Sequence, residues 1–194
     1  MVNYPGGVKK NLPKKETSYA KRGMMFEDMI NKSCEFYRDT KRAVLHKKPT
    51  PITIVKVDYP ERAHAKVTEA YFKTPSTTDY NGIYKGRYLD FEAKNTNNAS
   101  SLPLHNFHEH QIEHMRACHE QGAVAFVLVA FSKFNRYFYL PFEGLAAFWD
   151  AAAKDEGRKS IPLSYFEASC PEIELDLYGR LKFLDIVDKE VKNG

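Results

Sequence analysis

Residues 79–95 of the chain are DYNGIYKGRYLDFEAKN, and this stretch decides the fold. Two runs rich in aromatic and apolar residues, 79–84 and 87–95, flank the pair Lys85-Gly86. Short strand-like runs on either side of a two-residue turn containing glycine are typical of a β-hairpin. The sequence therefore predicts two neighbouring antiparallel strands here.

The second of these strands, YLDFEAKN at residues 88–95, separates its side chains into two sets. Successive side chains of a strand point to opposite faces. One set is apolar and faces a core: Leu89, Phe91 and Ala93. The other set is mostly charged: Tyr88, Asp90, Glu92 and Lys94. One interpretation is a solvated face with an ordinary ion pair. The other is a functional site, because Asp79 begins the preceding strand and the turn brings it towards Glu92.

The functional interpretation rests on the chemistry of this residue set. Two carboxylates, Asp79 and Glu92, together with the backbone carbonyl of Ala93, offer the hard oxygen ligands that Mg²⁺ prefers. A bound cation lowers the pKa of its water and neutralises charge on a reacting phosphate. Lys94, on the same face as Glu92, is suited to orient or deprotonate that water and to stabilise the phosphate. The pattern predicts metal-dependent phosphodiester hydrolysis.

The chain as a whole has the composition of a globular protein. It has 194 residues, 43% of them hydrophobic and 28% charged, which fits one domain. The longest apolar stretch, residues 123–131, is too short to cross a membrane, and the N-terminus lacks the apolar segment of a secretory signal. Three cysteines without a CxxC pattern speak against a disulfide framework or a cysteine zinc site and predict a cytoplasmic location.

Positive charge is concentrated at the start of the chain. Residues 1–48 contain 12 Lys/Arg and 5 Asp/Glu, a net of +7, whereas the whole chain carries +4. A basic arm beside a globular body is typical of proteins that bind phosphate backbones. The alternative is a solubilising tail. We expect residues 1–18 to form a flexible basic arm and residues 19–194 a single domain.

The remaining elements follow from periodicity and from turn residues. Helices are predicted at residues 18–38, 105–121, 141–153 and 181–192. Strands are predicted at residues 52–57, 66–73, 79–84, 87–95, 123–131 and 136–140, with a basic loop at 46–51. The apolar strand at 123–131 is expected to be covered on both faces. This order predicts an α/β protein with a mixed sheet and helices on its faces.

Several segments carry a resemblance to a known family. Asp79, Glu92 and Lys94 match the PD-(D/E)xK nuclease pattern, with Thr78 in place of its proline. The longer segments are TPSTTDYNGIYKGRYLDFEAKNT, HKKPTPI, VDYPER, EAYFK and LPLHNFHEHQIEHM. From about Asn3 to its end the chain resembles the RecU family of bacterial Holliday-junction resolvases. This resemblance implies a restriction-endonuclease-like mixed sheet flanked by helices, with a stalk protruding between strands. It also implies a homodimer that cuts four-way DNA junctions with Mg²⁺, or Mn²⁺ in its place, in recombination and repair.

The resemblance also assigns roles to individual residues. Asp79, Glu92 and Lys94 occupy the catalytic positions. Glu27 matches a further carboxylate on the first helix. Gln111 matches a polar position near the water or phosphate, and its alternative is an ordinary surface amide. The expected metal ligands are Asp79, Glu92, the Ala93 carbonyl and Thr77.

The DNA contacts are expected on the stalk, at about residues 69–79, and on basic residues near it. The rings of Tyr71 and Phe72 would stack on unpaired bases beside Lys73; the alternative is that one ring is buried in the core. The expected phosphate contacts are Arg22, Lys47, Lys48, Arg62 and Lys66. The resemblance further implies the recombinase RecA and a branch-migration helicase as partners.

A competing motif lies in the histidine-rich segment. His110, Glu113 and His114 match H-x-x-E-H, the signature of an inverted class of zinc peptidases. Histidines four residues apart on a helix share a face and are able to bind Zn²⁺. A zinc-dependent hydrolase is therefore one alternative function, and histidines that add charge near DNA are the simpler interpretation. A non-catalytic protein that binds junctions is a third, against which the intact Asp79, Glu92 and Lys94 set argues.

Overall fold

A computed structural model describes residues 19–58, 65–72, 77–154 and 157–193 of the chain, with the backbone alone for residues 19–22 and 193. The expected basic arm, residues 1–18, lies outside these ranges, and so do Arg62 and Lys73. Within the described part, no helix combines the length and apolar character required to span a membrane.

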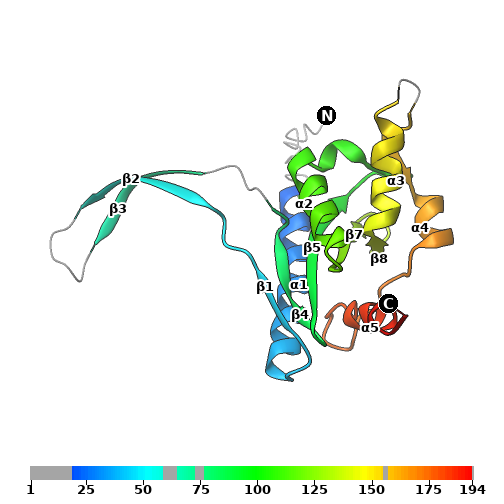
Figure 1. Ribbon diagram of the computed structural model, residues 1–194, viewed down its shortest axis with the longest axis horizontal. Coiled ribbons are helices and arrows are strands. Elements are labelled where there is room, and N and C mark those ends of the chain that lie inside the picture. The colour runs from blue at the N-terminus through cyan, green and yellow to red at the C-terminus, as the bar shows by residue number, and fades with distance from the viewer. Residues whose placement is uncertain (1–18, 59–64, 73–76, 155–156, 194) are drawn as a thin grey trace, which may run out of the picture.

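A five-stranded mixed sheet forms the centre of the molecule (Figure 1). Its order is β1 (Val44–Lys47), β4 (Tyr80–Tyr84), β5 (Arg87–Thr96), β7 (Val124–Phe131) and β8 (Arg136–Pro141). The pairing of β5 with β7 is parallel and the other pairings are antiparallel. The predicted α/β class and mixed sheet are confirmed.

Helices cover both faces of this sheet (Figure 1). Buried residues of α1 (Tyr19–Asp39) and α5 (Leu184–Asn193) form one apolar cluster with the sheet. Buried residues of α2 (Glu109–Glu120), α3 (Phe142–Ala152) and α4 (Leu163–Ser169) form a second. Alternate residues of β7 enter the two clusters, so the prediction of a strand covered on both faces is confirmed.

The β4–β5 hairpin forms where the sequence predicts it. Lys85 and Gly86 both have positive φ, 48° and 78°, as a type I′ turn requires. Tyr80 lies opposite Phe91, and their rings stack with centroids 4.9 Å apart. The ring of Phe91 stacks in turn on Phe126 of β7. These buried aromatics fix the register that places Asp79 beside Glu92.

Strand β1 corrects the prediction of a basic loop at residues 46–51. It pairs with β4 through Leu45, which faces Gly82. A Cβ atom on Gly82 would lie 1.9 Å from the carbonyl oxygen of Val44, so the absent side chain permits this close approach. The strand was missed because its four residues show no clear alternation.

Other short elements were also missed. Strands β6 (Ser101–Pro103) and β9 (Ser160–Pro162) pair with each other, and a 3₁₀ turn η1 (Leu104–Asn106) follows β6. Each of these elements has three residues, which are too few to show the periodic spacing of apolar residues from which strands and helices are predicted. Helix α2 begins at Glu109, four residues later than predicted, because η1 occupies the preceding segment.

A two-stranded hairpin projects from the body (Figure 1). Strands β2 (Ile52–Asp58) and β3 (Lys66–Phe72) pair only with each other among the described strands. The expected stalk, residues 69–79, overlaps only the end of β3, whereas the projecting hairpin consists of β2 and all of β3; residues 73–76 lie outside the described part. β-Branched residues predicted both strands, but their pattern does not reveal which partner a strand chooses.

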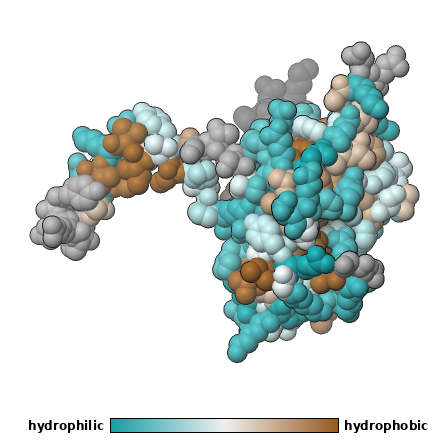
Figure 2. Space-filling model, in the orientation of Figure 1, coloured by the Kyte–Doolittle hydropathy of each residue, from teal (hydrophilic) through white to brown (hydrophobic). Residues whose placement is uncertain are grey.

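The hairpin exposes large apolar and aromatic side chains, and Figure 2 shows a brown, hydrophobic area on the projection. Those more than 45% exposed are Ile52, Ile54, Val55, Val67, Tyr71 and Phe72. Tyr71 is 61% exposed and Phe72 84%, so the alternative that one of these rings is buried is wrong.

Candidate active site

Asp79 and Glu92 meet at the edge of the β4–β5 hairpin. Asp79 directly precedes β4, and its backbone amide donates a hydrogen bond to Glu92 Oε2 over 3.1 Å. The Asp79 carbonyl accepts a 2.7 Å bond from the backbone amide of Lys48, which follows β1. Three strands of the sheet thus fix the position of Asp79.

Glu92 is 1% exposed, and this burial dominates its electrostatics. The pKa of its carboxyl is raised to about 7: burial is the largest cause, Lys94 opposes the rise, and the charge of Asp79 adds to it. A cation beside these two carboxylates would favour their ionised forms. The oxygen donors and the raised pKa therefore fit a divalent metal such as Mg²⁺.

Lys94 is held against Glu92 by three contacts. Its Nζ lies 2.9 Å from Glu92 Oε1, 3.2 Å from Gln111 Oε1 and 5.3 Å from the centre of the Phe107 ring. Gln111 is buried, and its Oε1 also accepts a 3.2 Å bond from the backbone amide of His108 in the capping box of α2. The surface-amide interpretation of Gln111 is therefore wrong, and the side chain orients Lys94.

Glu27 lies near this site but is paired elsewhere. It projects from α1, and its Oε2 is 2.5 Å from Lys47 Nζ of β1. Together with Asp79 and Thr77 it lines a cavity of about 320 Å³. Over the described ranges, Glu27, Asp79 and Glu92 do not form a cluster of three converging ligand atoms. The expected catalytic role of Glu27 stays a prediction.

Thr77 and the carbonyl of Ala93 are the two remaining expected metal ligands. Thr77 lines the cavity, and its hydroxyl donates a 3.3 Å bond to the carbonyl of Thr78. Ala93 is half-buried in β5 between Glu92 and Lys94. Their service as ligands stays a prediction.

Asp90 is a functional candidate that the sequence analysis did not single out. Its side chain is fully buried; Oδ1 accepts a 2.9 Å bond from Lys48 Nζ, and Oδ2 accepts a 2.8 Å bond from the Thr78 hydroxyl. His114 Nε2 lies 3.3 Å from Oδ2. The interpretation of this strand face as solvated is therefore wrong. The alternation of side chains along β5 places Asp90 on the same face as Glu92, so the sequence pattern was sufficient to identify Asp90 as a candidate.

The expected phosphate contacts have different environments. The Lys48 side chain is only 20% exposed and bonds to Asp90 and Thr78, so it supports the site from inside. Lys47 pairs with Glu27, while Lys66 is exposed at the start of β3. The Arg22 side chain lies outside the described part.

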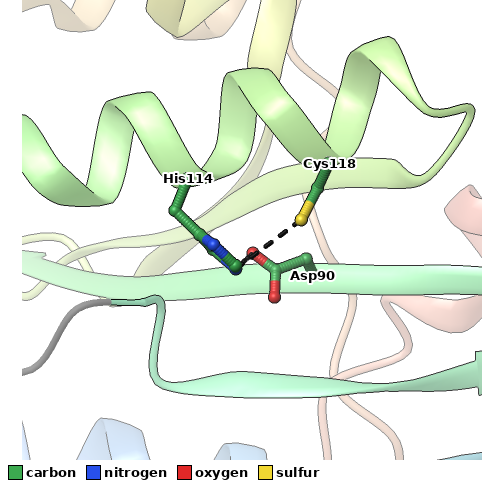
Figure 3. Close-up of side chains that lie close together, drawn as sticks. All are labelled: Asp90, His114 and Cys118. Carbon is green, nitrogen blue, oxygen red and sulfur yellow. Dashed lines mark hydrogen bonds and ion pairs between the residues drawn. The ribbon is translucent and has the colours of Figure 1, made fainter.

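The H-x-x-E-H motif does not assemble into a zinc peptidase site. His114 points towards Asp90 and Cys118 (Figure 3), and these three form the one three-residue group of potential metal ligands in the described ranges. His110 instead stacks on His108 with ring centroids 5.4 Å apart, and Glu113 is exposed. The structure does not support the alternative of a zinc-dependent hydrolase.

The chain is similar to known proteins along nearly its whole length. A family model described as RecU, Recombination protein U, matches residues 21–189. Holliday junction resolvase RecU of Pediococcus pentosaceus is 48% identical over 198 residues, covering 98% of this chain and 98% of that protein. Its counterpart from Listeria innocua is 47% identical over 197 residues, covering 97% and 98%.

A solved structure is also similar. Archaeoglobus fulgidus Hjc, a Holliday junction resolvase, matches with a TM-score of 0.41 and 13% identity over 75% of this chain and 93% of that one. The family assignment rests on the family model and on relatives that match nearly end to end: this chain belongs to the RecU family.

Proposed function

We propose that this protein is a nuclease that resolves four-way DNA junctions by metal-dependent hydrolysis of phosphodiester bonds. The observation that carries the proposal is the joining of Asp79, Glu92 and Lys94 at one edge of the β4–β5 hairpin. The relatives named Holliday junction resolvase supply the substrate class.

The oxygen atoms of Asp79, Glu92, Thr77 and the Ala93 carbonyl would hold Mg²⁺, or Mn²⁺ in its place. When bound, the metal would lower the pKa of a coordinated water and neutralise charge developing on the phosphate. The donor set supports this assignment because hard cations prefer carboxylate and carbonyl oxygens. The raised pKa of Glu92 supports it too, since a buried carboxylate beside Asp79 gains from a cation.

Lys94 would act on the water and on the phosphate. Its ammonium group is held by Glu92 and Gln111, so little reorientation is required when DNA enters. Gln111 is then a positioning residue: its buried amide oxygen fixes Lys94 and caps α2. Glu27 lines the neighbouring cavity and would help to place DNA or metal-bound water there.

The β2–β3 hairpin would enter the open centre of the junction. Its exposed rings, Tyr71 and Phe72, suit stacking on bases that lack a neighbour in the stack. Lys66 is exposed on the same hairpin, where it would meet phosphate. Lys73, Arg62 and Arg22 are expected to add phosphate contacts.

Two symmetric cuts require two active sites, so we infer that the working unit is a homodimer. Contacts with RecA and with a branch-migration helicase belong to the same proposal and follow from the family resemblance. The described cysteines are free thiols, as expected of a protein that works in the cytoplasm.

The test is single-turnover cleavage of a synthetic four-way junction in Mg²⁺, compared with a linear duplex of the same sequence. Wild type is expected to cut the junction, and Asp79→Asn to bind it equally well without cutting. The matched control is Asp150→Asn, which removes an exposed carboxylate of α3. Cleavage by Asp79→Asn at the wild-type rate would contradict the proposed site. Binding without any cleavage by wild type would favour an architectural protein.

A further inference from the structure

A group of three side chains outside the proposed Mg²⁺ site has the composition of a transition-metal centre (Figure 3). Asp90 comes from β5, and His114 and Cys118 come from successive turns of α2. One ligand atom from each lies within 4.8 Å of the other two. Carboxylate, imidazole and thiolate are ligands that Zn²⁺ accepts together, whereas Mg²⁺ takes oxygen ligands.

The two separations from His114 match tetrahedral coordination. His114 Nε2 lies 3.3 Å from Asp90 Oδ2 and 3.6 Å from Cys118 Sγ. With the usual zinc–ligand bond lengths, tetrahedral angles require about 3.3 Å between oxygen and nitrogen and about 3.6 Å between nitrogen and sulfur. These two separations equal those around a tetrahedral ion, and the third, between Asp90 and Cys118, is at most 4.8 Å.

Lys48 and Thr78 satisfy Asp90 by hydrogen bonds, whereas His114 Nε2 faces both Asp90 and Cys118. Nε2 carries at most one hydrogen, so it cannot donate fully to Asp90 and also accept fully from Cys118. A divalent ion in this position would bind the imidazole nitrogen, the thiolate sulfur and the carboxylate oxygen together.

Neighbouring residues orient Asp90, and the other two ligands are partly exposed to solvent. Lys48 holds Asp90 Oδ1, and the Thr78 hydroxyl bonds to Oδ2, so the carboxylate is oriented by outer partners as in many metal sites. The imidazole of His114 is partly exposed, and so is Cys118. Both side chains are thus in contact with solvent, and water would complete the coordination.

We propose that Asp90, His114 and Cys118 bind one Zn²⁺ or a similar divalent transition ion. As the sulfur–metal bond forms, the thiol loses its proton to solvent; His114 binds as neutral imidazole and Asp90 as carboxylate. The ion would link α2, which carries Gln111, to β5, which carries Glu92. It differs from the peptidase motif, because His110 and Glu113 are not ligands.

Cobalt substitution tests this site apart from the Mg²⁺ site, which has no sulfur ligand. The full-length protein is titrated with Co²⁺ in excess Mg²⁺, and absorption is recorded. We expect saturation at one equivalent, with a sulfur-to-cobalt charge-transfer band and the intense visible bands of a four-coordinate ion. Cys118→Ser is expected to lose the charge-transfer band, and His114→Gln to weaken binding at least tenfold.

Three controls make the result specific. Cys170→Ala, which removes a buried thiol elsewhere, is expected to keep the band, and so is Glu92→Gln. Zn²⁺ should displace Co²⁺ stoichiometrically and raise the melting temperature of wild type but not of Cys118→Ser. The proposal fails if no sulfur band appears, if Cys118→Ser retains it, or if Glu92→Gln abolishes it.

Discussion

Strand β5 and the β2–β3 hairpin are both rich in strand-forming residues, yet they reverse the usual placement of polar and apolar side chains. In β5 the ionisable residues Asp90 and Glu92 are buried. In the hairpin the apolar residues Tyr71 and Phe72 are exposed. Burying charged side chains and exposing apolar ones both reduce the stability of the fold, and such departures are typical of functional sites. The comparison assigns chemistry to buried charge and recognition to exposed apolar surface.

The two regions also differ in how they are held. Asp90 and Glu92 are each hydrogen-bonded to a lysine, and β5 lies between two paired strands. The hairpin strands pair only with each other among the described strands. We therefore expect substitutions at the buried site to change stability and catalysis, and substitutions on the hairpin to change binding alone.

The largest stability effect is expected for Lys48→Met. It removes the cation paired with fully buried Asp90, and leaving a buried charge without its partner costs about 3–5 kcal/mol. The neighbouring change Lys47→Met breaks an ion pair that is far more exposed, for which we expect at most about 1 kcal/mol. Chemical denaturation of both variants measures the difference. Equal losses would show that Asp90 does not depend on Lys48.

The next largest effect is the pH dependence of the free energy of unfolding in metal-free protein. The folded-state pKa of Glu92, about 7, lies above its ordinary value of 4.5, so the fold favours the protonated form. Its contribution to stability is complete below pH 4.5 and is lost as pH rises through about 7. Linkage gives a loss of about 3 kcal/mol. Unfolding in EDTA from pH 4.5 to 8 should show this slope in wild type and a smaller one in Glu92→Gln. Identical slopes would mean that Glu92 is not buried as described.

Much of both regions was predictable from the sequence. Alternation in β5 and the Lys85-Gly86 turn were sufficient to bring Asp79 to Glu92 and Lys94. The resemblance added Gln111, whose contact with Lys94 no local pattern reveals. The burial of Asp90 was not predictable, because it depends on Lys48, Thr78 and His114 from three other segments. The extent of the stalk was missed for a related reason: strand propensity does not specify pairing.

A smaller effect, on the affinity for junctions, is expected for a substitution in the β2–β3 hairpin. Phe72→Ala should weaken junction binding by about 1–3 kcal/mol, the contribution of one stacked base, and leave the melting temperature unchanged. Phe134→Ala removes another exposed ring, in the turn between β7 and β8, and should not alter binding. Fluorescence anisotropy with junction and linear duplex measures both variants. An equal loss on both DNAs would contradict a role in selecting junctions.

The smallest effect is expected for Lys66→Ala. An exposed lysine that meets one phosphate contributes about one unit to the slope of log affinity against log salt. The slope for junction binding should therefore fall by about one, with little change in sequence preference. Lys133→Ala, which removes a lysine from the turn after β7, serves as the control. An unchanged slope for Lys66→Ala would remove this residue from the DNA interface.

The most direct measurement separates the two regions in one experiment. Junction affinity and single-turnover cleavage at saturating enzyme are measured in Mg²⁺ for wild type, Glu92→Gln and Phe72→Ala. We expect Glu92→Gln to bind like wild type but to cleave about 10³-fold more slowly. Phe72→Ala should bind junctions more weakly, yet retain most of the cleavage rate once bound. Cleavage by Glu92→Gln at the wild-type rate would show that the buried carboxylate of β5 does not carry the chemistry.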